Sequence, residues 1–220
     1  MRGLYAITPE TPDTVRLLEQ VRSAIAGGAA VVQYRSKRVT RDIIRMQAEA
    51  LRALTRATGT LFIVNDDSDL ALSVLADGVH LGRDDGDALS IFRIRQQCAM
   101  RMGQIPAQPF MIGVSCYNEL PRAEAAVAAG ADYVAFGSFF SSPTKPFALR
   151  ADVALIQAAR SRLNVPIVAI GGITVDNAQQ LISSGADMVA VITSLFDAND
   201  IEHRAREFTR LFESGNHVCQ

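Results

Sequence analysis

Two clusters of carboxylates directly follow two short apolar segments of the chain. Residues 61–64 end at Asn65-Asp66-Asp67, and residues 78–81 run into Gly82-Arg83-Asp84-Asp85. Asparagine and aspartate in surface turns hydrogen-bond their own backbone, so ordinary loops would account for both clusters. If the clusters converge in space, they could instead hold Mg²⁺, a hard cation that proteins bind through one or two carboxylates plus substrate phosphates. The positions of the two apolar segments in the fold distinguish between these interpretations.

Basic side chains and a glycine pair stand after other apolar segments. Arg35 and Lys37 follow the segment VVQY, and Lys145 lies in a Ser/Pro-containing stretch after YVAFG. Such cations could form simple ion pairs with the carboxylates, or they could grip phosphate oxygens. Gly171-Gly172 follows PIVAI, and glycine lets backbone N–H groups approach a ligand closely, although a tight turn alone would also favour it. Together these residues indicate a site that handles phosphate with Mg²⁺.

The apolar segments that precede these residues are typical of buried strands. Several begin after a shared pattern of small residues, as in AGGAAVVQYR, AAGADYVAFG and SSGADMVAVI. A run of four or five apolar residues suits a parallel strand that is buried on both faces. The sequence predicts eight such strands, near residues 3–7, 31–35, 61–65, 78–81, 111–115, 133–137, 167–170 and 188–192.

Helical segments alternate with these strands. Residues 11–28 carry Val15, Leu18, Val21 and Ile25 at spacings of three and four, which predicts one buried helix face. Strict alternation calls for a parallel sheet, and eight units indicate a closed TIM (β/α)8 barrel spanning residues 1–220 as a single α/β domain. A doubly wound open sheet is the main alternative. Further helices are predicted within 41–57, 121–130, 151–160 and 175–185.

A closed barrel would bring the candidate residues together. Active sites of TIM barrels lie at the carboxyl ends of the strands. The third and fourth strands are neighbours there, so Asp66 and Asp85 can converge, which favours the Mg²⁺ interpretation for them. The other residues at predicted strand ends are Thr8, Gln33, Arg35, Lys37, Asn65, Ser115, the segment 141–145, Gly171, Gly172 and residues 192–194.

Composition excludes several classes of partner. The net charge of −1 offers no global attraction to nucleic acid or to an anionic membrane. No apolar run approaches the ~18 residues of a membrane span, and the start of the chain lacks the apolar core of a signal peptide. Three widely spaced cysteines without a CxxC pair favour a reducing cytoplasm over disulfides or a zinc site.

The ordered set of motifs resembles the thiamine-phosphate synthase family over nearly the whole chain. Single motifs such as GADYVxxG and GGI occur in many phosphate-binding barrels, so the specificity comes from their combination. The motifs are LYAIT at 4–8, VQYRSK at 32–37, VNDD at 64–67, DGVHLGRDD at 77–85, GVS at 113–115, GADYVAFGSFF at 130–140, PTK at 143–145, AIGGI at 169–173 and GADMVAVI at 185–192.

The resemblance implies a transferase that joins a hydroxymethylpyrimidine diphosphate to a thiazole phosphate and releases diphosphate. It implies that Lys145, Arg35 and Ser115 assist the reaction, and it leaves open whether the chain forms a homo-oligomer. Carried over position by position, Gln33, Arg35, Lys37, Asn65, Ser115 and Lys145 would bind the pyrimidine diphosphate, Asp66 and Asp85 would bind Mg²⁺, Ser142 and Thr144 would contact the thiazole, and Gly172, Ile192 and Thr193 would surround its phosphate.

Three positions depart from the usual family pattern. Arg83 stands where glutamine is common, Tyr117 replaces a frequent histidine, and Ser142 replaces threonine. These differences concern thiazole binding and leave the implied reaction unchanged. A thiazole tautomerase-like relative is the nearest alternative, but that family places a proton-transferring histidine where this chain has Tyr117. A phosphate-ligand-binding barrel without catalysis is the other alternative, and it would have little need of the clustered Asp66, Asp85 and Lys145.

Overall fold

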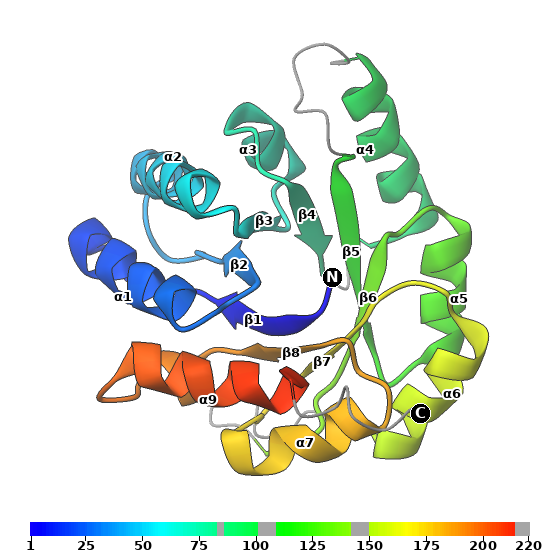
Figure 1. Cartoon of the computed structure of the whole chain (residues 1–220). Helices are drawn as coiled ribbons and strands as arrows, with labels where there is room; N and C mark the ends of the chain where they lie inside the picture. Colours follow the sequence, from blue (N-terminus) through cyan, green and yellow to red (C-terminus); the bar gives the residue numbers. More distant parts are fainter. Residues whose placement is uncertain (83–85, 101–108, 142–149, 214–220) are drawn as a thin grey trace.

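Eight parallel strands form the centre of the molecule. The computed structural model describes residues 1–82, 86–100, 109–141 and 150–213. Each strand pairs with the next along the chain, and β1 pairs with β8, so the sheet closes into a barrel. The predicted TIM barrel is confirmed, with helices ringed around the strands (Figure 1). The strands are β1 (Gly3–Ile7), β2 (Val31–Tyr34), β3 (Leu61–Asn65), β4 (Gly78–Leu81), β5 (Met111–Tyr117), β6 (Tyr133–Phe136), β7 (Ile167–Ile170) and β8 (Met188–Val191).

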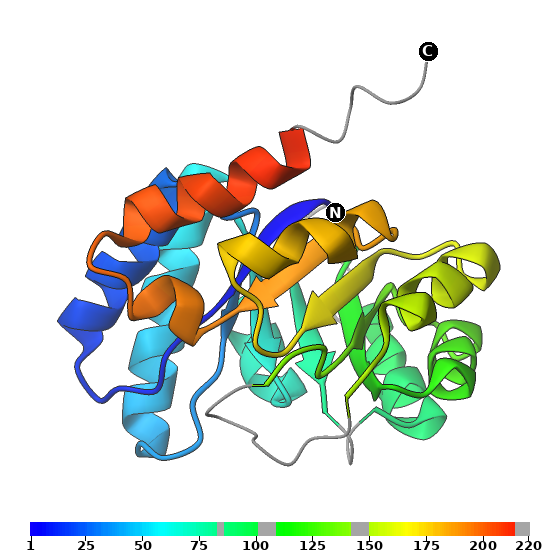
Figure 2. The same cartoon turned by 90° about the horizontal axis from the view of Figure 1, so that it is seen from below.

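Helices cover the outside of the barrel. Figure 2 shows the red α9 beside the blue α1, where the last helix packs against the first. Within the described ranges, no helix combines the length and the apolar composition needed to cross a membrane. The helices are α1 (Thr14–Ala26), α2 (Arg41–Thr58), α3 (Ser68–Ser73), α4 (Ala88–Met100), α5 (Leu120–Ala128), α6 (Val153–Arg162), α7 (Val175–Ser183), α8 (Thr193–Phe196) and α9 (Ile201–Glu213).

The predicted face of α1 is confirmed in part, because Val21 is buried and Leu18 and Ile25 pack against the core. Leu17, Val21 and Ala24 are its fully buried side chains, whereas Val15 is 67% exposed. Both sets of residues fit a helical repeat, because apolar residues stand on more than one stripe of this segment. Packing against the strands and the neighbouring helices selects the stripe through Leu17, so the prediction for Val15 was wrong.

Alternate strand residues point into the barrel, as the period of two along a strand requires. The aromatic ring of Tyr133 fills part of this interior, and it lies where a side chain on β5 would otherwise stand. A Cβ atom on Gly113 would come within 2.0 Å of that ring, so only glycine fits there. The inward apolar cluster comprises Tyr5, Ile7, Val31, Ile63, Tyr133, Ala135, Val168, Met188 and Ala190.

Three arginine–aspartate pairs close the amino-terminal end of the barrel. The aspartates recur at positions 77, 132 and 187, each just before an even-numbered strand. Each carboxylate accepts the backbone N–H of the preceding strand (Phe62, Ile112 and Ile167) at 2.6–2.8 Å. Each also pairs with an arginine of an outer helix, and these pairs are Arg52–Asp77, Arg95–Asp132 and Arg160–Asp187. We call these three pairs the arginine–aspartate clasps.

The clasps explain part of the repeat seen in the sequence. The GAD motif before β6 and β8 supplies the carboxylate of a clasp, and Asp77 supplies it before β4. The matching segment before β2 has Ala30 instead and therefore has no carboxylate at this place. This part of the repeat therefore belongs to the amino-terminal end of the barrel. The candidate site lies at the opposite end, at the carboxyl ends of the strands.

Candidate active site

The loop after β2 is fixed at the barrel mouth by residues of the β1 end. Glu10 Oε1 accepts the backbone N–H groups of Lys37 at 2.6 Å and Arg38 at 2.5 Å. Partial burial favours the neutral acid, but these two hydrogen bonds prevail and lower the pKa of Glu10. Thr8 Oγ1 also accepts the backbone N–H of Arg35 at 3.0 Å. The predicted phosphate-binding cations therefore stand on an ordered loop, and the sequence reading missed the role of Glu10.

Asp66 occupies a special position directly after β3. Its backbone is left-handed, with φ +62°, a conformation that aspartate and asparagine tolerate better than other non-glycine residues. Its Oδ1 accepts the backbone N–H of Gly82 at 3.1 Å, and its Oδ2 pairs with Lys37 Nζ at 2.9 Å. Its backbone N–H donates to His80 O, which ties the ends of β3 and β4 together. Asp66 and Lys37, both predicted site residues, are thus in contact.

The neighbouring Asp67, not Asp66, hydrogen-bonds the local backbone, as the ordinary-loop interpretation would require. Its carboxylate accepts the backbone N–H of Leu70 at 2.8 Å, as an N-cap of α3. Asp66 is therefore left to present its carboxylate to the mouth. A carboxylate has about four lone-pair sites, so Asp66 retains capacity for a hard cation beside its two present partners.

The described residues contain no group of three or more His, Cys, Asp or Glu side chains that could enclose a metal. The carboxylate of Asp66 at the strand end suits Mg²⁺, which takes few protein ligands and completes its shell with phosphate and water. It does not fit a closed structural site of four protein ligands. Asp66 and the predicted Asp85 are the residues that would hold the ion.

Gln33 and Ser115 are joined through the interior of the barrel. Gln33 Nε2 donates to Tyr5 OH at 2.9 Å, and Tyr5 OH lies 2.8 Å from Tyr133 OH. Tyr133 OH lies 3.1 Å from His80 Nδ1, and His80 Nε2 lies 2.9 Å from Ser115 Oγ. His80 is 8% exposed, and burial lowers its pKa to about 4, so its ring is neutral near pH 7. His80 is therefore a hydrogen-bonded residue of the barrel interior.

The end of β5 carries a bulge between Ser115 and Tyr117. Tyr117 has a left-handed backbone, with φ +55°. Arg122 of α5 lies over its ring at 5.9 Å and donates from Nε to the backbone oxygen of Ser115 at 3.0 Å. No motif in the sequence pointed to Arg122, because its segment reads as an ordinary alanine-rich helix.

Gly171 and Gly172 follow β7 with φ values of +104° and +63°. A Cβ atom on Gly172 would lie 2.4 Å from the backbone oxygen of Ser141, so this glycine also permits close packing of the segment after β6. Asn177, in the first turn of α7, donates to Gly172 O at 3.1 Å and completes a capping box with Thr174. The two explanations for the glycine pair, tight packing and backbone contact with a phosphate, are therefore compatible.

The end of β8 leads into the short helix α8. Ile192 precedes this helix, and its backbone oxygen accepts the N–H groups of Leu195 and Phe196. Thr193 lines a small cavity of about 290 Å³ together with Asp197, Asn199 and Arg204. The predicted phosphate residues thus lie at the ends of β7 and β8, on the same end of the barrel as Asp66.

Four predicted site residues lie outside the described residues. They are Asp85, Ser142, Thr144 and Lys145, and Arg83 also lies outside. Of the remaining predicted residues, the structure brings Lys37 to Asp66 and connects Gln33 to Ser115. Asn65 is the last residue of β3 and pairs in register with His80 of β4.

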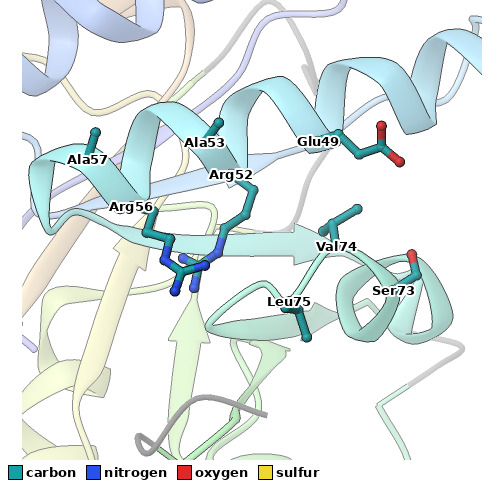
Figure 3. Close-up of a pocket in the computed structure, with 8 residues that line it drawn as sticks. All are labelled: Glu49, Arg52, Ala53, Arg56, Ala57, Ser73, Val74 and Leu75. Atoms are coloured by element: carbon teal, nitrogen blue, oxygen red, sulfur yellow. The ribbon is translucent and has the colours of Figure 1, made fainter. Parts of the chain in front are cut away.

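A larger cavity than the one beside Thr193 lies elsewhere. It measures about 630 Å³ and lies outside the barrel, between α2 and the connection from α3 to β4. Figure 3 shows Arg52 and Arg56 extending from α2 toward this connection. Arg52 belongs to a clasp at the amino-terminal end, so the size of this cavity does not mark it as the active site.

Comparison with known proteins agrees with this geometry. The chain is 50% identical over 214 residues to a thiamine-phosphate synthase of Aromatoleum aromaticum, covering 97% of this chain and 98% of the relative. It is 52% identical over 212 residues to one of Thiobacillus denitrificans, covering 96% and 94%. A solved thiamine phosphate pyrophosphorylase from Pyrococcus furiosus superposes with a TM-score of 0.81 at 33% identity, covering 96% of each chain. A sequence model described as thiamine monophosphate synthase matches residues 4–195, and the chain belongs to this family.

Proposed function

We propose that this protein catalyses the thiamine-phosphate synthase reaction. A hydroxymethylpyrimidine diphosphate loses its diphosphate, and the nitrogen of a thiazole phosphate bonds to the resulting carbon. The CH₂–O bond breaks with its electron pair leaving on the diphosphate, and the new C–N bond forms from the thiazole lone pair. The products are thiamine phosphate and diphosphate. The proposal is carried by full-length identity of about 50% to synthases together with the charged groups gathered at the mouth.

The main catalytic task is to stabilise negative charge on the departing diphosphate, because the reaction needs no nucleophilic side chain. Arg35 and Lys37 stand on the loop that Glu10 and Thr8 anchor, so the backbone of both residues is held in place before substrate binds. Lys37 is 54% exposed and paired with Asp66, and we expect it to exchange this partner for a phosphate oxygen. Lys145, from outside the described residues, is expected to contact the same diphosphate.

Mg²⁺ bound by Asp66 and Asp85 would supply Lewis-acid stabilisation of the diphosphate. The left-handed backbone of Asp66 directs its carboxylate while Asp67 caps α3, so one residue serves the ligand and its neighbour serves the fold. Asn65, at the end of the same strand, is expected to bind the pyrimidine diphosphate.

The thiazole partner is expected at the other side of the mouth. Gly172 would offer its backbone to the thiazole phosphate, with Ile192 and Thr193 beside it. The first turn of α7 follows at Val175, and a helix of this length favours an anion near its amino terminus. Ser142 and Thr144, which lie outside the described residues, would contact the thiazole.

The tautomerase-like alternative is less well supported. Eight curated relatives at 46–52% identity are described as thiamine-phosphate synthases. The position that carries a catalytic histidine in the tautomerase-like relative holds Tyr117 here, with Arg122 over its ring.

A direct assay tests the proposed function. The purified protein is incubated with both substrates and Mg²⁺, and the products are followed by mass spectrometry. We expect thiamine phosphate and diphosphate in equal amounts, loss of turnover in EDTA, and a reduced kcat for Lys145→Ala. Failure to form thiamine phosphate with either Mg²⁺ or Mn²⁺ would overturn the proposal.

A further inference from the structure

The buried hydrogen-bond chain from Gln33 to Ser115 has a direction. Its three inner members, Tyr5, Tyr133 and His80, are 1%, 0% and 8% exposed, and they come from β1, β6 and β4. Each tyrosine hydroxyl has a single proton, so it can donate only once within the chain. A neutral imidazole likewise has one N–H and one acceptor nitrogen. The orientation of each link therefore fixes the orientation of the next.

The amide of Gln33 sets this direction. Its Nε2 donates to Tyr5 OH, so the proton of Tyr5 is free to donate to Tyr133. Tyr133 in turn donates to Nδ1 of His80, which must then carry its proton on Nε2 and donate to Ser115 Oγ. With the Gln33 amide nitrogen facing Tyr5, reversing any link would leave a buried hydroxyl proton without an acceptor among these partners, at a considerable energetic cost.

The two residues at the ends of this hydrogen-bond chain therefore present opposite groups to the mouth. Gln33 uses its amide nitrogen inward, and no hydrogen bond among the described residues uses its Oε1. Ser115 Oγ accepts from His80 inward, so its own proton is available to an outside acceptor. Gln33 thus offers the mouth an acceptor, and Ser115 offers it a donor.

We propose that Tyr5, Tyr133 and His80, which we call the relay, are positioning residues. Together they fix which hydrogen-bonding atom Gln33 and Ser115 each present to the mouth. The relay presents an acceptor at Gln33 and a donor at Ser115, and it thereby selects a ring that carries both an amino donor and a ring-nitrogen acceptor. An aminopyrimidine meets this requirement. A 4-oxopyrimidine does not, because its carbonyl oxygen accepts a hydrogen bond where the amino group would donate one. This specificity role rests on the proposed function, since it assigns the pyrimidine to these two residues.

The space for the relay is built into the barrel. The rings of Tyr133 and His80 stack with centroids 5.6 Å apart. Gly113 of β5 leaves room for the Tyr133 ring, because a Cβ atom there would lie within 2.0 Å of it. A matched buried tyrosine exists outside the relay, since Tyr34 OH donates to Gln47 Oε1 at 2.8 Å on the outer face of the sheet. Tyr34→Phe therefore removes a similar buried hydrogen bond without touching the relay.

The first test reads the relay without substrate. The chain has three histidines, so ¹⁵N-histidine labelling with a His80→Gln variant assigns the His80 signals. We expect the proton on Nε2 in the wild-type protein and in Tyr34→Phe. In Tyr133→Phe, which leaves Nδ1 without its donor, we expect a mixture of tautomers. A proton on Nδ1 in the wild-type protein would overturn the assigned direction.

The second test measures discrimination between the aminopyrimidine diphosphate and its 4-oxo analogue. In Tyr5→Phe the amide of Gln33 can rotate, so we expect the ratio of the two binding constants to fall by on the order of tenfold. Tyr133→Phe should lower the same ratio, while Tyr34→Phe should leave it unchanged, with melting curves to confirm folding. An unchanged ratio in both relay variants would overturn the proposal. If the wild-type protein still forms thiamine phosphate, that result leaves the proposed function intact.

Discussion

The two ends of the barrel use charge differently. At the amino-terminal end, the carboxylate of Asp77 accepts hydrogen bonds from Arg52 and from the backbone N–H of Phe62. The Arg52 and Asp77 side chains are only 11% and 16% exposed. At the mouth, Lys37 is 54% exposed and Asp66 is 27% exposed, although their ion pair is equally short. The first pair is buried within the protein, although Arg52 Nε has no hydrogen-bond partner among the described residues, whereas the second is exposed enough to exchange its partners for a ligand.

This difference separates stability from activity within one fold. A clasp holds a strand and an outer helix together, and removing one of its members leaves the other buried and unpaired. The mouth pair holds no element that its neighbours do not already fix, since Glu10 anchors the loop of Lys37 and Asp67 caps α3. Substitutions at the two ends should therefore change different observables.

The largest effect is expected at Asp66. Asp66→Asn removes the charge and keeps a residue that tolerates the left-handed backbone. We expect kcat to fall about a thousandfold, which corresponds to about 4 kcal/mol of transition-state stabilisation, with little change in Tm. Steady-state kinetics at saturating Mg²⁺ measures this loss.

The neighbouring Asp67→Ala is the control for Asp66→Asn. It should cost about 1 kcal/mol of stability through loss of the α3 cap and should retain kcat. Full activity of Asp66→Asn in EDTA would contradict the metal assignment.

The opposite pattern is expected at the amino-terminal end. Asp77→Ala should lower the free energy of unfolding by about 3 kcal/mol, because the guanidinium of Arg52 is left buried without its carboxylate. The values of kcat and KM at 25 °C should remain close to those of the wild-type protein. Urea denaturation and steady-state kinetics measure the two effects. Asp132→Ala should cost less, because the side chains of that pair are 33% and 37% exposed. A lower kcat or a changed KM in folded Asp77→Ala would contradict the assignment of stability to the amino-terminal end and of activity to the mouth.

The stability of the protein should depend on pH through His80, which lies in the barrel interior between the two ends. Burial lowers its pKa from 6.5 to about 4, although the charge of Asp66 opposes this shift. The unfolded chain takes up a proton on His80 below about pH 6.5, whereas the folded protein does so only near pH 4. Stability should therefore fall as the pH decreases through this window, by on the order of 3 kcal/mol in total.

Denaturation curves between pH 7 and pH 4 measure this effect. His80→Gln should flatten the profile, and His203→Gln, on the exposed face of α9, should leave it unchanged. Equal slopes for the wild-type protein and His80→Gln would show that other groups dominate the acid response.

The smallest effect is expected at Glu10. Glu10→Gln weakens the charge-assisted hydrogen bonds that hold the backbone of Lys37 and Arg38, so the loop after β2 becomes less ordered. We expect KM for the pyrimidine diphosphate to rise about tenfold, equivalent to about 1.4 kcal/mol, with a smaller change in kcat. Glu49→Gln, in an exposed pair with Arg45, is the matched control and should leave KM unchanged. Equal KM values for Glu10→Gln and the wild-type protein would mean that the loop is held by other contacts.

The sequence predicted the barrel because its strands are short, apolar and regularly followed by helices. The predicted strand near residues 61–65 coincides with β3, and that near 78–81 coincides with β4. Closure by pairing of β1 with β8 follows from the count of eight units. The face of α1 was predicted only in part, because the segment offers two apolar stripes and only packing selects Leu17 over Val15.

Within the candidate site, the sequence by itself determined which residues stand at strand ends, because parallel strands place their carboxyl ends on one side. It therefore grouped Asp66, Lys37 and Gly172 before their contacts were known. Only the tertiary structure decided that Asp67 is the helix cap and that Asp66 has a left-handed backbone. The contact of Glu10 with the loop after β2 and the relay from Gln33 to Ser115 also required the closed barrel. Such contacts join residues far apart in the chain, and no local pattern of residue types records which side chains the closed barrel turns toward one another.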